Sequence, residues 1–339
     1  MIPRIFLLLI AIISIVNIAF SQTADEYCTR GNSMISLKDY AGAMEAYNKS
    51  LELKPDYTEA YFNRAGLKFN LKDYKGAADD YSQVIALKPA DASAYRSRGE
   101  ARYMMKDYGG AQADYQKALE IDPKDSKSFK ALGDLHYTLK EYQNAITQYN
   151  RAAELNTNNA DIYFNRGISK FNLQNYTGAI TDFNASIEIN PVNARVYNSR
   201  GAAKVKQEEY EGAIEDYSKA ISLNPGYEDA YYSRGNASLK IADFQGAIED
   251  FTMVISLNPE DALSFFYRGN AKHLMEDHKE AIKDYSEAID LDPAMTDAYY
   301  FRGLSRLHLR QKETACSDFK KATDLGHTHA NEKMKAFCE

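Results

Sequence analysis

Histidine and cysteine are the side chains best suited to metal binding and nucleophilic chemistry, and their spacing in this chain favours neither. No histidine stands at metal-ligand spacing from a cysteine or carboxylate. His273 and His308 could face the same surface of the fold, but two histidines are too few for a convincing site. No phosphate-binding glycine loop or nucleophile motif is present. The sequence therefore predicts no enzyme activity, no cofactor and no metal. The histidines are His136, His273, His278, His308, His327 and His329.

A repeat of 34 residues organises the chain. Counted from Ala24, nine repeats follow without an insertion, and the last ends at His329. In every repeat, positions 4 and 24 are aromatic and position 20 is alanine. Position 8 is glycine except for Ala65 in the second repeat, which permits close contact between helices. Seven of the eight prolines share one column, at Pro55, Pro89, Pro123, Pro191, Pro225, Pro259 and Pro293.

This pattern resembles the tetratricopeptide repeat family, whose repeat is a helix, a turn and a second helix that ends at a proline. The resemblance covers residues 24–329 and implies an all-α fold, a right-handed superhelical solenoid of nine helix-turn-helix repeats. Neighbouring repeats would share one core and form a concave inner groove. We expect the helices at about positions 2–14 and 18–30 of each repeat. Residues 330–339 would then form a C-terminal capping segment.

Arginine at position 7 and aspartate at position 23 form two further columns. Arginine is present in eight repeats and aspartate in seven, and the fourth repeat lacks both. If arginine pairs with the aspartate of its own repeat, only Arg30 lacks a partner, because Ala46 stands in the aspartate column. If it paired with the aspartate of the preceding repeat, Arg64 and Arg166 would also lack one. We therefore expect a structural ladder of ion pairs within repeats. The fourth repeat also has Thr157 in the proline column, so any less rigid joint of the solenoid is expected there.

The resemblance places the ligand groove at positions 2, 5, 6, 9, 12 and 13 of the first helices. These positions carry cations in the middle repeats and aromatic residues in the later ones, which would suit an extended peptide with an acidic portion and apolar anchors. The alternative is that the aromatic rings pack between repeats and the charges are simply solvated. The candidate ligand-binding residues are Arg96, Lys127, Lys130, Asn165, Arg195, Tyr232, Phe266 and Tyr300.

Some members of the family hold the terminal carboxylate of a peptide with lysine, asparagine and arginine side chains. Lys130, Asn165 and Arg195 are the nearest match in this chain. Asp134, however, stands where an asparagine is expected, and Ser199 stands where a basic residue is expected. These two departures weaken the prediction of carboxylate capture.

Residues 1–21 are typical of a secretory signal peptide, with Arg4, an apolar run over 5–20 and a small-residue cleavage site before Gln22. An uncleaved anchor helix is the alternative, although the run is short for a bilayer span. The formal net charge of -7 and the lack of a long basic stripe argue against a nucleic-acid partner. We expect a secreted or periplasmic protein with no stable membrane insertion after signal removal.

Two of the three cysteines lie near the C-terminus. In an oxidising compartment, Cys316 and Cys338 are expected to form a disulfide. The stretch over 315–338 also resembles the C-terminal cap of exported bacterial repeat proteins. Two unpaired buried thiols are the alternative. Cys28 is expected to be a packed small hydrophobe.

These observations favour an exported protein-protein interaction scaffold that binds a peptide or protein segment in its concave groove. The alternative is a structural protein of the cell envelope that associates with itself through the ends or faces of the solenoid. A catalytic protein is the third and least supported hypothesis, because the sequence offers no constellation of residues for it.

Overall fold

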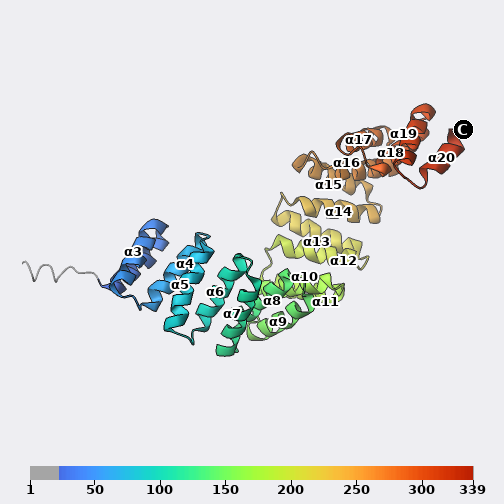
Figure 1. The fold of residues 1–339 in the computed structure, drawn as a ribbon. Helices are drawn as coiled ribbons and strands as arrows, with labels where there is room; N and C mark the ends of the chain where they lie inside the picture. Colours follow the sequence, from blue (N-terminus) through green and yellow to red (C-terminus); the bar gives the residue numbers. More distant parts are fainter. Residues whose placement is uncertain (1–22, 339) are drawn as a thin grey trace, which may run out of the picture. The chain divides into compact units, whose positions relative to one another are not determined.

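The computed structural model describes residues 23–338, and every regular element in that range is an α-helix (Figure 1). The chain divides into two compact units, residues 1–157 and 158–339. The division follows Thr157, the residue that replaces proline in the fourth repeat. The predicted signal peptide, residues 1–21, lies outside the described residues. In the range that is described, no helix combines the length and apolar character needed to cross a membrane.

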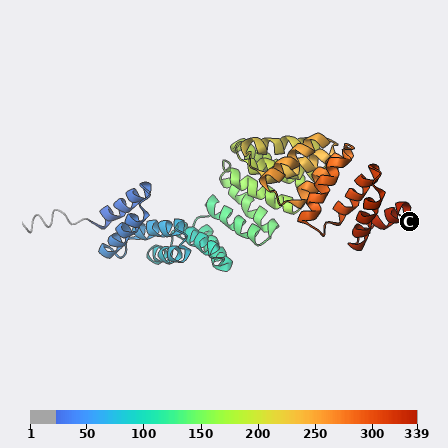
Figure 2. The same cartoon turned by 90° about the horizontal axis from the view of Figure 1, so that it is seen from above.

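The first unit is a stack of helix pairs, each joined by a short turn, and Figure 2 shows it from a second direction. Each pair packs against the next one along the chain. The helices are α2 (Ala24–Ser36), α3 (Tyr40–Leu53), α4 (Thr58–Asn70), α5 (Tyr74–Leu87), α6 (Ala92–Met104), α7 (Tyr108–Ile121), α8 (Ser126–Thr138) and α9 (Tyr142–Leu155).

The second unit repeats the arrangement and ends in a short additional helix that packs on α19. Its elements are α10 (Ala160–Asn172), α11 (Tyr176–Ile189), α12 (Ala194–Val205), α13 (Tyr210–Leu223), α14 (Glu228–Lys240), α15 (Phe244–Leu257), α16 (Ala262–Leu274), α17 (His278–Leu291), α18 (Thr296–His308), α19 (Lys312–Asp324) and α20 (Ala330–Phe337). The expected fold class, an all-α solenoid of helix-turn-helix repeats, is confirmed in both units.

Local sequence signals set the ends of these helices. In the first repeat, Lys38 has a left-handed φ of 61°, which reverses the chain between α2 and α3. Asp39 then caps α3 by accepting a hydrogen bond of 2.9 Å from the Gly42 amide. The helix ends at Leu53, two residues before Pro55, because proline lacks an amide hydrogen and disfavours helical backbone before it. Corresponding turns recur at the same positions along both units.

The small residue at position 8 allows the two helices of a repeat to approach closely. A Cβ atom on Gly99 would lie only 2.6 Å from Cε1 of Tyr115, the ring at position 24. In the second repeat, where Ala65 carries a Cβ, the Tyr81 ring lies edge-on to the Phe62 ring, with ring centroids 5.3 Å apart. Glycine therefore stands in this column because the ring occupies the space that a side chain would need.

The ladder expected within repeats is confirmed. In each pair the arginine donates two hydrogen bonds to the aspartate, through Nε and Nη2, and the aspartate side chains are only 3 to 6% exposed. The pairs are Arg64–Asp80, Arg98–Asp114, Arg166–Asp182, Arg200–Asp216, Arg234–Asp250, Arg268–Asp284 and Arg302–Asp318.

Two further contacts of the ladder were not predicted. The remaining guanidinium nitrogen reaches the preceding repeat, as when Arg200 Nη1 donates to Asn184 Oδ1 at 2.6 Å. A second cation at position 11 also binds the aspartate, as Lys204 does at 2.8 Å from Asp216. The aspartate therefore joins two helices of its own repeat and, through the arginine, the repeat before it.

The seventh repeat lacks the second cation, because Ser238 occupies position 11. Burial raises the pKa of Asp250, and hydrogen bonding and charge attraction from Arg234 do not fully offset this. In the other six pairs position 11 is lysine or arginine. Asp250 is thus the ladder carboxylate with the least cationic compensation.

The C-terminal end is closed by a disulfide between Cys316 on α19 and Cys338 after α20, with Cα atoms 5.7 Å apart. Ala330, the first residue of α20, is fully buried, so the short helix covers the end of the last repeat. Cys28 is 1% exposed and lies in the core of the first repeat. This position fits the packing role expected for Cys28.

The incomplete ladder leads to a stability prediction for Ser238→Lys. An acid whose folded pKa is raised stabilises the fold when protonated, and this contribution is lost as pH rises through the folded pKa. At pH 7 the added lysine should compensate the Asp250 carboxylate and contribute about 1 kcal/mol, or about 2–4 °C in the melting temperature of the second unit. Calorimetry at pH 7 measures this gain.

Ser238→Met is the matched control, because it adds a side chain of similar length without a charge. We expect no gain from methionine, and we expect the lysine gain to shrink as pH falls and Asp250 becomes protonated. Equal melting temperatures for the two variants at pH 7 would contradict the role assigned to the missing cation.

Candidate functional site

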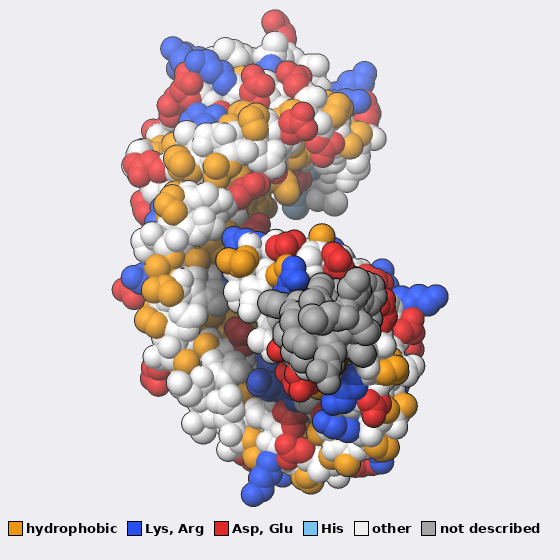
Figure 3. Space-filling view, turned by 90° about the vertical axis from the view of Figure 1, so that its left-hand side faces the viewer, with side chains coloured by type: hydrophobic (Ala, Val, Ile, Leu, Met, Phe, Trp, Pro, Cys, Tyr) orange, Lys and Arg blue, Asp and Glu red, His pale blue; other side chains and the backbone are white. Residues whose placement is uncertain are grey.

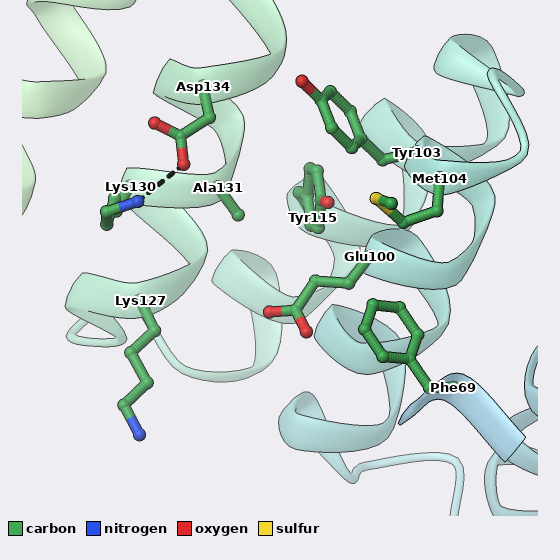
Figure 4. A pocket seen from close by; sticks show the side chains of 9 residues that line it. All are labelled: Phe69, Glu100, Tyr103, Met104, Tyr115, Lys127, Lys130, Ala131 and Asp134. Atoms are coloured by element: carbon green, nitrogen blue, oxygen red, sulfur yellow. Dashed lines mark hydrogen bonds and ion pairs between the residues drawn. The ribbon is translucent and has the colours of Figure 1, made fainter. Parts of the chain in front are cut away.

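Each unit contains a hollow lined by the first helices of successive repeats. The hollow in the first unit has a volume of about 340 Å³ and lies among α4, α6, α7 and α8 (Figure 4). We call it the Glu100 hollow. Its lining residues are Phe69, Glu100, Tyr103, Met104, Tyr115, Lys127, Lys130, Ala131 and Asp134.

Opposite charges line the two sides of the Glu100 hollow. Glu100 projects into it from α6, and Lys127 and Lys130 lie on α8 (Figure 4). Lys130 Nζ is 2.7 Å from Asp134 Oδ2, so this ammonium group is already paired. The Asp134 carboxylate also accepts a hydrogen bond of 2.7 Å from the Tyr149 hydroxyl. Among the described residues, no carboxylate lies within ion-pair distance of Lys127.

The carboxyl group of Glu100 is partly desolvated. Desolvation raises the pKa of its carboxyl group, although Arg96 and Lys130 act in the opposite direction. The closest ion-pair contact of Glu100 is to Arg96 Nε, at 3.9 Å, and its side chain remains 47% exposed. The carboxylate is therefore accessible to a ligand and lacks a close partner of opposite charge.

Arg96, one of the predicted ligand-binding residues, has a structural partner instead. Its Nη1 atom binds Asp125, the residue that caps the N-terminus of α8, and its side chain is only 17% exposed. The pair ties α6 to α8. The structure thus places Lys127 and Lys130 together in the hollow, and Arg96 lies beside it.

The second unit contains a hollow of about 380 Å³ with fewer charged lining residues, which we call the Tyr267 hollow. The Asn270 amide oxygen accepts a hydrogen bond of 2.8 Å from the Tyr285 hydroxyl, which fixes the orientation of that amide. The lining residues are Asn236, Leu239, Lys240, Tyr267, Asn270, His273, Leu274 and Phe301.

The predicted aromatic residues lie around the Tyr267 hollow but do not line it. The ring centroid of Tyr232 is 6.0 Å from that of Tyr267. Phe266 is only 7% exposed and packs in the core of the eighth repeat and its neighbour α18. Tyr300 stacks on His327 with centroids 4.1 Å apart, beside the C-terminal cap. Phe266 and Tyr300 therefore pack between elements, as the alternative interpretation of these rings expected.

The other predicted residues of the second unit lie on α10 and α12. Asn165 is half-buried on α10, and Arg195 is exposed on α12 with its guanidinium group 5.3 Å from the centroid of the Phe164 ring. Lys130, the third member of the suggested carboxylate clamp, belongs to the first unit.

Several lining residues were not singled out from the sequence, among them Glu100, Tyr103 and Asn236. A signal for them existed, because they stand at position 9 or 12 of their repeats. Of all the residues that line the two hollows, only Tyr115 lies outside the six groove positions named above. The six groove positions alone would have predicted both hollows, whereas the cations and aromatic rings at those positions predicted only part of the lining.

Charge is intermixed on the face of the molecule that Figure 3 shows. On the face shown in Figure 3, basic and acidic side chains lie next to one another, without a large area of one sign. In the described part of the chain, no three histidine, cysteine, aspartate or glutamate residues are arranged to hold a metal ion.

Comparison with protein families gives consistent matches along the chain. A TPR repeat model matches residues 31–72, 133–174 and 201–241. Two tetratricopeptide repeat models match residues 92–125 and 262–295, and residues 58–91, 160–193 and 228–261. Together they cover most of residues 31–295. A search of curated proteins found no match.

Solved structures share the fold. The C-terminal part of a TPR repeat-containing protein from Cytophaga hutchinsonii is 22% identical, with a TM-score of 0.61, over 70% of this chain and 97% of that chain. A tetratricopeptide repeat protein from Parabacteroides merdae is 21% identical, with a TM-score of 0.51, over 73% of this chain and 99% of that chain. Pseudomonas aeruginosa PilF is 21% identical, with a TM-score of 0.51, over 61% and 95%.

The raised pKa of Glu100 leads to a prediction for Glu100→Gln. Because the folded pKa is raised, the stabilising contribution of this acid is lost as pH rises through that pKa. The glutamine variant should therefore be slightly more stable than the wild type at pH 7, by less than about 1 kcal/mol because the side chain is partly solvated. The difference should vanish near pH 4, where the wild-type carboxyl group is also largely protonated.

Urea unfolding at both pH values measures the effect. Glu45→Gln, on the exposed surface of α3, is the control and should behave as the wild type at each pH. A loss of stability in Glu100→Gln at pH 7 would show that the carboxylate serves the fold and is not held available for a ligand.

Proposed function

Because this chain belongs to the tetratricopeptide repeat family, we propose that it is an exported protein-protein interaction scaffold that binds a peptide or protein segment along its first helices. The observation that carries the proposal is the composition of the two hollows. Nearly all their lining residues come from the first-helix positions that face the groove in this family. Both hollows are open to an extended segment, and each combines apolar walls with a few polar groups.

The charges of the Glu100 hollow indicate what the segment would carry. Lys127 offers an exposed ammonium group, so an acidic side chain suits that side. Glu100 offers a partly desolvated carboxylate opposite, which suits a basic or amide donor. Phe69 and Tyr103 supply apolar surface for the stems of such side chains. We propose a segment with an acidic and a basic residue close together as the ligand of the first unit.

The Tyr267 hollow suits a different part of a ligand. Leu239, Leu274 and Phe301 form apolar walls, and the amides of Asn236 and Asn270 provide hydrogen-bonding groups for a peptide backbone. An apolar side chain in an extended segment would fit this surface.

Export rests on the signal-like N-terminus and on the cysteines. A disulfide between Cys316 and Cys338 persists in an oxidising compartment and is rare where thiols are kept reduced. A secreted or periplasmic location is therefore part of the proposal.

Selection from a random peptide library tests the ligand. We expect the mature protein to enrich peptides with neighbouring acidic and basic residues, because each charge would meet an opposite one in the Glu100 hollow. Lys127→Glu should weaken binding of the selected peptides at least about tenfold, the effect of roughly 1.4 kcal/mol. The double variant Glu100→Lys with Lys127→Glu should recover binding to peptides with the two charges exchanged.

Lys106→Glu is the matched control, because Lys106 lies in the exposed turn after α6 and outside the hollow. It should bind as the wild type does. Equal loss in Lys106→Glu and Lys127→Glu would mean that net charge alone governs binding. No enrichment, together with a mass that increases with protein concentration, would reject groove binding and favour the self-associating structural protein.

Sequencing of the N-terminus tests export separately. The protein recovered from the periplasm or the medium should begin at Gln22, because the small residues Ala19 and Ser21 form the cleavage signal. A chain that retains residue 1 and stays with the membrane fraction would indicate the uncleaved anchor. A chain that retains it in the cytosol would reject export.

A further inference from the structure

Three of the six histidines meet at the junction of the eighth and ninth repeats. His273 lies in the last turn of α16, His278 is the first residue of α17, and His308 is the last residue of α18. Their ring centroids are 5.0 Å apart for His273 and His278, 5.7 Å for His273 and His308, and 4.3 Å for His278 and His308. The last two rings are stacked, so the three imidazoles form one contact cluster.

Hydrogen bonds in the cluster favour one tautomer of a neutral His273. The Ser305 hydroxyl is placed to donate to the Phe301 carbonyl at 3.0 Å, so its oxygen can accept from His273 Nδ1 at 2.8 Å. A neutral His273 therefore carries its proton on Nδ1. This bond runs from α16 to α18 and links the two repeats. The Nδ1 atom of His278 is buried and has no hydrogen-bond partner among the described residues.

Few opposite charges surround these rings. The turn between α16 and α17 supplies Glu276 and Asp277, which favour a charged His278. On α14, Lys240 lines the same hollow as His273 and adds positive charge. On α17 and α18, His278 and His308 are the charged neighbours that act on His273. A second proton in the cluster would thus meet a positive neighbour and little compensation.

The pKa values of the cluster follow from this arrangement. Burial, together with His278 and His308, lowers the pKa of His273 to about 4. Burial and His308 also lower the pKa of His278, and they outweigh the two carboxylates of the turn. A histidine with a lowered folded pKa contributes stability that is present above its unfolded pKa and lost as pH falls through the folded one. For His273 the relevant window is between about pH 6.5 and 4.

We propose that His273, His278 and His308 form an acid-sensitive joint between the eighth and ninth repeats. At neutral pH the uncharged rings pack together and the His273 bond to Ser305 holds α16 against α18. Acidification charges rings that are in contact, and their repulsion opens this junction. Because His273 also lines the Tyr267 hollow, the opening changes the shape of that hollow. The inference does not require a ligand, so it stands independently of the proposed peptide binding.

Histidine titration by NMR tests the proposal on the mature full-length protein in the presence of EDTA. The Cε1–H signal of His273 should titrate below pH 5 in the wild type. Its midpoint should rise by about 0.5 pH unit or more in His308→Gln and in His278→Gln, because each variant removes a positive neighbour. His329→Gln is the control, since His329 is 70% exposed near the cap and outside the cluster.

Thermal unfolding at pH 7.5 and pH 5.0 provides the second readout. The wild type and His329→Gln should lose more melting temperature between these pH values than His278→Gln and His308→Gln lose. Independent titration of His273 and His278 near pH 6.5 would overturn the proposal. So would an identical pH dependence of melting in all four proteins, even if the cluster variants were less stable at both pH values.

Discussion

The buried aspartate at position 23, present in seven of the nine repeats, is the interaction on which the arrangement of those repeats depends. It lies on the second helix and binds an arginine from the first helix of the same repeat. That arginine also contacts the preceding repeat, as Arg98 does through Ser82. Removing one partner would leave a buried charge uncompensated, which costs about 3–5 kcal/mol. The carboxylate therefore fixes three helices at once, and its recurrence carries that geometry along each unit.

A framework fixed in this way leaves the groove positions free to vary. The ladder uses positions 7, 11 and 23, and the close helix contact uses positions 8 and 24, so none of the six groove positions is needed for either. Individual groove residues nevertheless take structural roles, such as Arg96 at position 5, which binds the cap of α8. Lys127, at position 2 of the next repeat, has no such partner among the described residues. A groove position therefore makes a side chain available to a ligand, and contacts with neighbouring side chains determine whether it stays available.

The sequence predicted the features that recur from repeat to repeat and missed the contacts that occur at a single position. Columns of glycine, aromatic residues and proline indicated the helix pairs, and the joint loss of arginine and aspartate in one repeat indicated how the ladder pairs. Pairing of Lys130 with Asp134 and stacking of Tyr300 on His327 occur at single positions, so no column reports them. His278 was missed for a related reason, because it stands at the start of a second helix, outside the groove positions.

The second unit contains two departures from the regular pattern, and they respond to acid in opposite directions. Protonation of Asp250, whose pKa is raised, relieves a poorly compensated buried charge in the seventh repeat. Protonation of the histidine cluster creates uncompensated charge at the junction of the next two repeats. In a solenoid each repeat contacts only its neighbours, so these effects remain local and need not cancel at the same place. Acidification would then loosen the eighth and ninth repeats while the seventh becomes firmer, which confines the change to the Tyr267 hollow and the end beyond it.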